Sequence, residues 1–84
     1  TTPYIAPDES YLVFARMENG QFYVSFRSKG GDWQPPVSLG ERLRGVCPQV
    51  SPDGKYLFYL GEGVVWVDTK TIEALRPGKT HALR

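Results

Sequence analysis

Short runs of aromatic and branched apolar residues, one of them with a period of two, recur along the chain and are typical of β-strands. Residues 11–15 and 21–27 form the first such pair, and Asn19-Gly20 between them favours a tight hairpin turn. Residues 33–40 predict an outer strand, because their two adjacent prolines exclude a central position in a sheet. With a strand before residue 11, this pattern predicts a meander of four strands.

A second group of strands follows with the same pattern. Residues 48–51, 56–60 and 64–68 predict three strands, and no outer strand follows them. Residues 70–76 instead predict a short helix, since their apolar positions are spaced for a single stripe and Pro-Gly comes next. The polar tail 79–84 is expected to be loose.

The two groups repeat one another in sequence. Residues 3–14 recur 45 positions later as residues 48–59, and five of the twelve aligned positions are identical. An internal period of this length indicates a repeat architecture. We therefore divide the chain into a first repeat over 1–42, a second, incomplete repeat over 43–69, and a C-terminal helix and tail over 70–84.

The turns at the centre of each repeat resemble those of a known family. The blocks around Pro7-Asp8 and Pro52-Asp53, each followed by Tyr-Leu, are similar to the Pro-Asp repeats of TolB-like, WD-repeat-like β-propellers in exported bacterial proteins. The resemblance implies an all-β fold of two antiparallel propeller blades, the second lacking its outer strand, with a short C-terminal helix. It also implies a periplasmic or extracellular location, although the chain contains no signal segment.

The resemblance has a consequence for partners. A propeller closes with roughly 4–8 four-stranded blades, so two blades do not close a ring. We expect the partner to be protein: either further copies of this chain or the remaining blades of a longer parent chain.

Composition limits the classes of partner and ligand that the chain is expected to bind. The formal net charge is +1, which gives no field that would attract nucleic acid. No apolar run reaches the roughly 20 residues of a membrane span. One cysteine and one histidine supply neither an internal disulfide nor a zinc ligand set. The sequence thus predicts no cofactor and no metal.

The repeated turn residues have a structural interpretation. A catalytic carboxylate has no reason to recur in each repeat, whereas Asp commonly accepts hydrogen bonds from backbone amides in its own turn. Gly supplies the positive φ that such turns need. The residues assigned to this structural role are Pro7, Asp8, Pro52, Asp53 and Gly54.

Arginine and aromatic residues outside the strand cores are the better candidates for recognition, because Arg and Trp are enriched at protein interfaces. We expect Tyr59 and Trp66 to belong to the core, and Cys47 to be a small buried apolar group. The binding candidates are Arg16, Arg27, Trp33, Arg44 and Gln49.

The chain carries no catalytic signature. None of its serines stands in a Gly-x-Ser-x-Gly nucleophile elbow. We therefore expect a non-catalytic repeat module for protein interaction or scaffolding. Two alternatives stay open: a gating or substrate-binding portion of a larger hydrolase such as a prolyl-oligopeptidase-like peptidase, and a small sugar- or peptide-binding blade assembly with a channel lined by Tyr4, Arg16 and Gln49.

Overall fold

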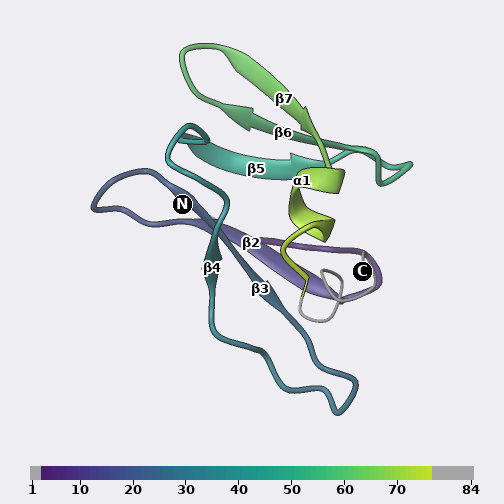
Figure 1. Ribbon diagram of the computed structural model, residues 1–84. Coiled ribbons are helices and arrows are strands. Elements are labelled where there is room, and N and C mark those ends of the chain that lie inside the picture. Colours follow the sequence, from purple (N-terminus) through teal and green to yellow (C-terminus); the bar gives the residue numbers. More distant parts are fainter. Residues whose placement is uncertain (1–2, 77–84) are drawn as a thin grey trace.

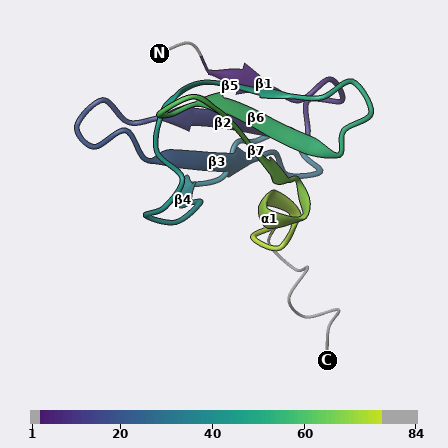
Figure 2. The ribbon, with the colours of Figure 1, turned by 90° about the horizontal axis from the view of Figure 1, so that it is seen from above.

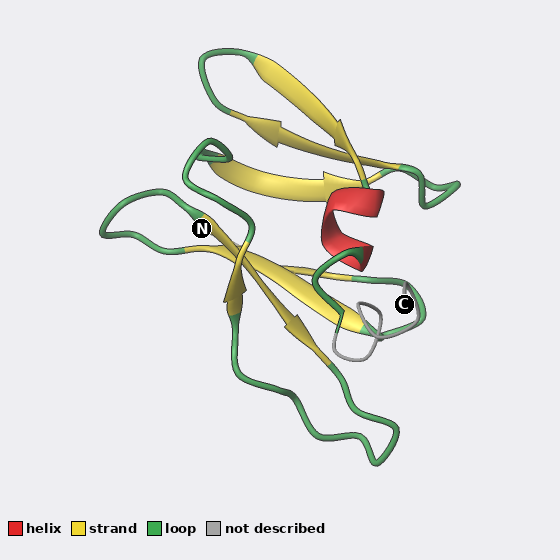
Figure 3. Cartoon of the chain, viewed as in Figure 1, coloured by secondary structure: helices red, strands yellow, loops and turns green. Residues whose placement is uncertain are grey.

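The computed structural model describes residues 3–76, which fold into two antiparallel β-sheets and one short helix (Figures 1 and 3). The prediction of an all-β chain with two antiparallel sheets is confirmed. The first sheet contains, in spatial order, β1 (Tyr4–Ile5), β2 (Tyr11–Ala15), β3 (Phe22–Phe26) and β4 (Val37–Ser38). The second contains β5 (Val46–Val50), β6 (Tyr56–Leu60) and β7 (Val64–Asp68), and α1 (Lys70–Glu73) follows.

The core lies between the two sheets, which stack as two layers with α1 at one end (Figure 2). Phe22 and Val24 of β3 and Leu57 of β6 belong to one cluster of buried apolar residues, and all three side chains are fully buried. The rings of Phe22 and Tyr59 pack edge to face across the two sheets, with centroids 4.9 Å apart. Burial of these apolar side chains on the facing sides is what holds the sheets together.

The connection from the first sheet to the second runs along the start of β3. The amide of Phe22 donates to the carbonyl of Leu43 at 3.2 Å, and the amide of Gly45 donates to the carbonyl of Gly20 at 2.9 Å. Gly45 also passes directly beside β6: an added Cβ would overlap the carbonyl oxygen of Leu60 and lie 3.0 Å from Tyr59 Cδ2. Only glycine fits where the chain crosses between the sheets.

The helix is shorter than the sequence predicts. It ends at Glu73 instead of residue 76, because the amides of Leu75 and Arg76 donate to carbonyls three residues back, which tightens the last turn. Ile72 is the one fully buried residue of α1, and it belongs to the core cluster between the sheets. No helix in residues 3–76 has the length and apolarity needed to cross a membrane.

The outer strand of the first sheet is also shorter than expected. Over residues 33–40 only Val37–Ser38 pairs with β3, and Trp33 adds an isolated bridge to Arg27. Pro35 and Pro36 lie between these two contacts and have no N–H to donate, so the ladder is interrupted there. The tail over residues 79–84, which was expected to be loose, lies outside the described residues.

Candidate interaction surfaces

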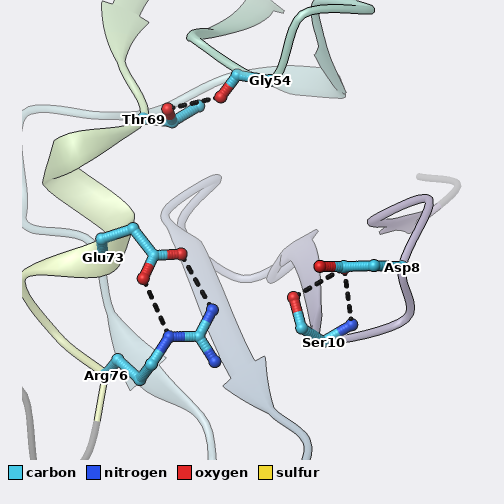
Figure 4. Close-up of polar contacts among 6 residues, drawn as sticks. All are labelled: Asp8, Ser10, Gly54, Thr69, Glu73 and Arg76. Carbon is cyan, nitrogen blue, oxygen red and sulfur yellow. Dashed lines mark hydrogen bonds and ion pairs between the residues drawn. The ribbon is translucent and has the colours of Figure 1, made fainter.

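The first Pro-Asp turn is held by its own carboxylate. Oδ1 of Asp8 accepts hydrogen bonds from the amide of Ser10 at 3.0 Å and from its hydroxyl at 2.7 Å (Figure 4). The hydroxyl, followed by the amide, lowers the pKa of Asp8 below its ordinary value, since both stabilise the charged form. Glu9 next to it takes a positive φ of 61°.

The second turn repeats this arrangement. Oδ1 of Asp53 accepts from the hydroxyl of Ser51 and from the amide of Lys55, and the Ser51 hydroxyl is the main cause of its lowered pKa. Gly54 has a φ of 77° and occupies the position equivalent to Glu9. Both carboxylates thus accept hydrogen bonds within their own turns.

A polar groove of about 350 Å³ separates the two turns, and α1 closes one side of it (Figure 4). Glu73 and Arg76 form two hydrogen bonds of 2.8 Å, and the Thr69 hydroxyl donates to the carbonyl of Gly54 at 2.7 Å. The guanidinium of Arg76 also lies 4.7 Å from the centre of the Phe26 ring. These contacts fasten α1 to both sheets, so we assign the groove a structural role.

Burial has a chemical effect on Tyr11, which lies beneath this groove. Loss of solvent, followed by the nearby Tyr4, Glu73 and Asp8, raises the pKa of the Tyr11 phenol to about 12. A phenol of this kind stays neutral at physiological pH. The Tyr11 ring belongs to the buried core and packs edge to face on Phe26 with centroids 6.3 Å apart.

Two of the predicted binding residues come together at the far end of β3. The guanidinium of Arg27 lies 5.5 Å from the centre of the Trp33 ring, pairs with the Glu9 carboxylate at 2.7 Å and donates from Nε to the carbonyl of Gly31. Trp33 remains partly exposed. Arg27 thus holds the loop in place through its contacts with Glu9 and Gly31, and 43% of Trp33 is exposed.

The other three predicted binding residues lie apart. Arg16 stacks over Tyr23 at 4.5 Å on the side of the first sheet that faces away from the second. Arg44 donates from Nε to the carbonyl of Glu41, and Gln49 lines a pocket on the far side of the second sheet. Since Arg16 and Gln49 lie on surfaces that face away from one another, a single chain does not place both in one channel with Tyr4.

Within residues 3–76, five exposed apolar side chains gather on one surface that the sequence reasoning missed. It is the side of the second sheet that faces away from the core, called here the outer face of the second sheet. The expectation that Trp66 belongs to the core is wrong: 60% of it is exposed, and its ring packs edge to face on Tyr56 at 5.2 Å. Tyr59, on the other side of β6, is buried as expected. The outer face of the second sheet consists of Tyr56, Phe58, Leu60, Val64 and Trp66.

A signal for this surface was present in the sequence. Residues 56–60 and 64–67 are apolar at consecutive positions, and strands with apolar residues on both faces are those buried on both sides. The described chain covers only one side of β6 and β7. Two shallow pockets of about 300 and 220 Å³ lie on the other side, and Phe58 lines both.

Cys47 differs from expectation as well. It is exposed, because the pairing of β5 with β6 shifts by one residue between Val46 and Gln49, and Cys47 in this β-bulge has a φ of 56°. The bulge turns its side chain toward the pocket that Phe58 and Leu60 line. The exposure of the Cys47 sulfur therefore depends on whether the outer face of the second sheet is covered.

The second sheet also ends in an unpaired strand. Within residues 3–76, β7 pairs with β6 alone, whereas β3 in the first sheet pairs with strands on both sides. In the same range, no group of three or more His, Cys, Asp or Glu side chains is arranged to hold a metal ion. In the part of the chain that the structure describes, the edge of β7 that faces away from β6 is thus not paired with another strand.

Comparisons with known proteins add no name. No family model matches the chain, and no curated protein or solved structure is significantly similar to it. The function is therefore argued from the geometry.

Proposed function

We propose that the chain is a non-catalytic protein-interaction module built from two β-propeller-type blades. The observation that carries the proposal is the five-residue strand β7, which has one free edge and lies beside exposed apolar side chains. An exposed edge of this kind is a template for an added strand from a partner protein. The propeller assignment is supported by the internal repeat, by the four-strand meander and by the resemblance of the Pro-Asp turns, which also favours an exported protein.

The hydrogen-bond pattern identifies which amides face the free edge. Thr69 donates to the carbonyl of Lys55, and Gly61 donates to the carbonyl of Gly63, so residue pairs 55/69 and 61/63 are hydrogen-bonded positions of the β6–β7 ladder. Bonded and non-bonded pairs alternate in an antiparallel ladder. The amides of Val64 and Trp66 therefore point away from β6 and are available to a partner strand.

The test uses short random peptides selected for binding to the immobilised chain. We expect selected peptides with alternating apolar residues, whose binding slows hydrogen exchange at the amides of Val64 and Trp66 by about tenfold or more. The variant Trp66→Pro lacks the outward N–H and should abolish this protection. Its control, Trp66→Ala, also lacks the indole but keeps the N–H, and should retain it.

The proposal fails if the selected peptides protect amides elsewhere, or if Trp66→Pro and Trp66→Ala behave alike. Proline at this position removes no bond of the β6–β7 ladder, so the comparison is made between two folded variants. Near-ultraviolet circular dichroism of both variants verifies their packing.

A further inference from the structure

The internal repeat relates the outer face of the second sheet to a surface that is buried inside the same chain. The 45-residue offset makes Val13 equivalent to Phe58, and the strand partners of these residues extend the relation to β3 and β7. The buried members are 0% exposed, whereas their equivalents are 37–71% exposed. The equivalent pairs, buried member first, are Val13 and Phe58, Val24 and Trp66, and Phe22 and Val64.

The second sheet covers Val13, Val24 and Phe22 of the first sheet. Leu57 and Tyr59 project from β6 onto the first sheet, and Tyr59 packs on Phe22. Their equivalents in the first repeat are Leu12 and Phe14. These two lie on the opposite side of the first sheet, and neither is fully buried.

That opposite side is called here the outer face of the first sheet. Phe14 stacks on Tyr23 with ring centroids 6.0 Å apart, and Ile5 pairs with Leu12 and is half exposed. The outer faces of the two sheets thus carry the equivalents of the two surfaces that pack against each other inside the chain. The outer face of the first sheet consists of Ile5, Leu12, Phe14 and Tyr23.

We propose that the outer face of the second sheet binds the outer face of the first sheet of a second copy of this chain. A second copy is the expected partner because the contact between the two sheets inside one chain can be repeated between chains. The residues that form that contact have equivalents on the two outer faces. Phe14 of the copy packs on Val64 in the way that Tyr59 packs on Phe22. The inference rests on the proposed function, because it names one protein partner of the module.

The two contact surfaces differ, so the association is head-to-tail. Contacts of this kind build closed rings when the rotation between copies closes, and open filaments when it does not. Apolar surface covered in this way is the driving force, at about 25 cal/mol per Å² buried. The outer face of the second sheet is thereby protected from solvent in all copies of a closed ring.

Light scattering on the complete chain tests the proposal over a dilution series from about 1 mM to about 1 μM, a range that brackets weak and moderate affinities. Wild type is expected to exceed the 9.5 kDa mass of one chain. Phe58→Glu blocks one surface and Ile5→Glu blocks the other, and each should weaken association by at least about tenfold. Val37→Glu is the matched control, because Val37 is as exposed as Phe58 but lies on neither surface.

Mixing the two variants gives the sharper result. Phe58→Glu retains an intact outer face of the first sheet, and Ile5→Glu retains an intact outer face of the second. An equimolar mixture should therefore form a 1:1 dimer and nothing larger, while each variant alone stays monomeric. Cys47 supplies a second readout: its reaction with a maleimide should slow when wild type assembles, because it lies beside Phe58.

Three outcomes overturn the proposal. One is a wild-type chain that is monomeric over the whole range, and another is association that none of the face variants weakens more than Val37→Glu does. The third is association that depends on Phe58 but not on Ile5, which would mean that two copies of the same surface meet. None of these results affects peptide binding at the edge of β7, so the proposed function is tested separately.

Discussion

Replacing Gly45 by alanine should cause more steric overlap than the same change at any other glycine of residues 3–76, and we expect it to destabilise the chain. The new Cβ overlaps the carbonyl oxygen of Leu60 and meets Leu60 C and Tyr59 Cδ2 at 3.0 Å. Relief requires moving either β6 or the connection, and Gly45 also donates the hydrogen bond to Gly20. Overpacking costs about 1–3 kcal/mol, and a strained backbone hydrogen bond costs about 1 kcal/mol more.

We therefore expect the free energy of unfolding to fall by about 2–4 kcal/mol, a large share of the total for a chain of this size. Urea denaturation followed by tryptophan fluorescence measures it. With a slope of about 1 kcal/mol per molar urea, the midpoint falls by about 2 M or more. Gly63→Ala is the control, because no atom lies within 4 Å of its added Cβ, and it should change stability by less than about 0.5 kcal/mol. Equal midpoints for Gly45→Ala and wild type would refute the reasoning.

Two further predictions concern the core. Ile72→Ala should lower the free energy of unfolding by about 2–5 kcal/mol, because Ile72 is fully buried where α1 closes the core; a loss below about 1 kcal/mol in urea denaturation would show that α1 is not docked. The raised pKa of Tyr11, about 12 against 10.0 for a free phenol, means that the unfolded chain loses this proton first. Stability is thus unaffected by Tyr11 below pH 10 and falls as the pH rises from 10 toward 12. Tyr11→Phe should flatten that fall, and absorbance at 295 nm should show one fewer late-titrating tyrosine; identical profiles would contradict the assignment.

Much of the fold follows from local sequence. The strands at residues 11–15, 56–60 and 64–68 are predicted to the residue, since short runs of β-branched and aromatic residues between turn residues mark them without reference to the rest of the chain. Asp8 and Asp53 each accept a hydrogen bond from an amide only two residues away, so these Asx-type contacts also depend on local sequence.

Features that depend on distant contacts were predicted poorly. The helix ends in a tightened last turn, after which Arg76 packs on Phe26 of the first sheet. The exposure of Cys47 depends on a register shift against β6. Trp66 has the composition of a core residue, but whether it is buried depends on which side of β7 another layer covers. Sequence pattern cannot choose between the two apolar sides of such a strand.

The sequence by itself determined that this protein is an antiparallel β-structure, because strand composition and turn chemistry are properties of short segments of the chain. Only the tertiary structure decided which surfaces remain available. Packing of Leu57 and Tyr59 on the first sheet buries one side of the second and leaves Phe58 and Trp66 on the other. Exposure is a property of how layers stack, and the stacking is fixed by contacts between residues far apart in the chain.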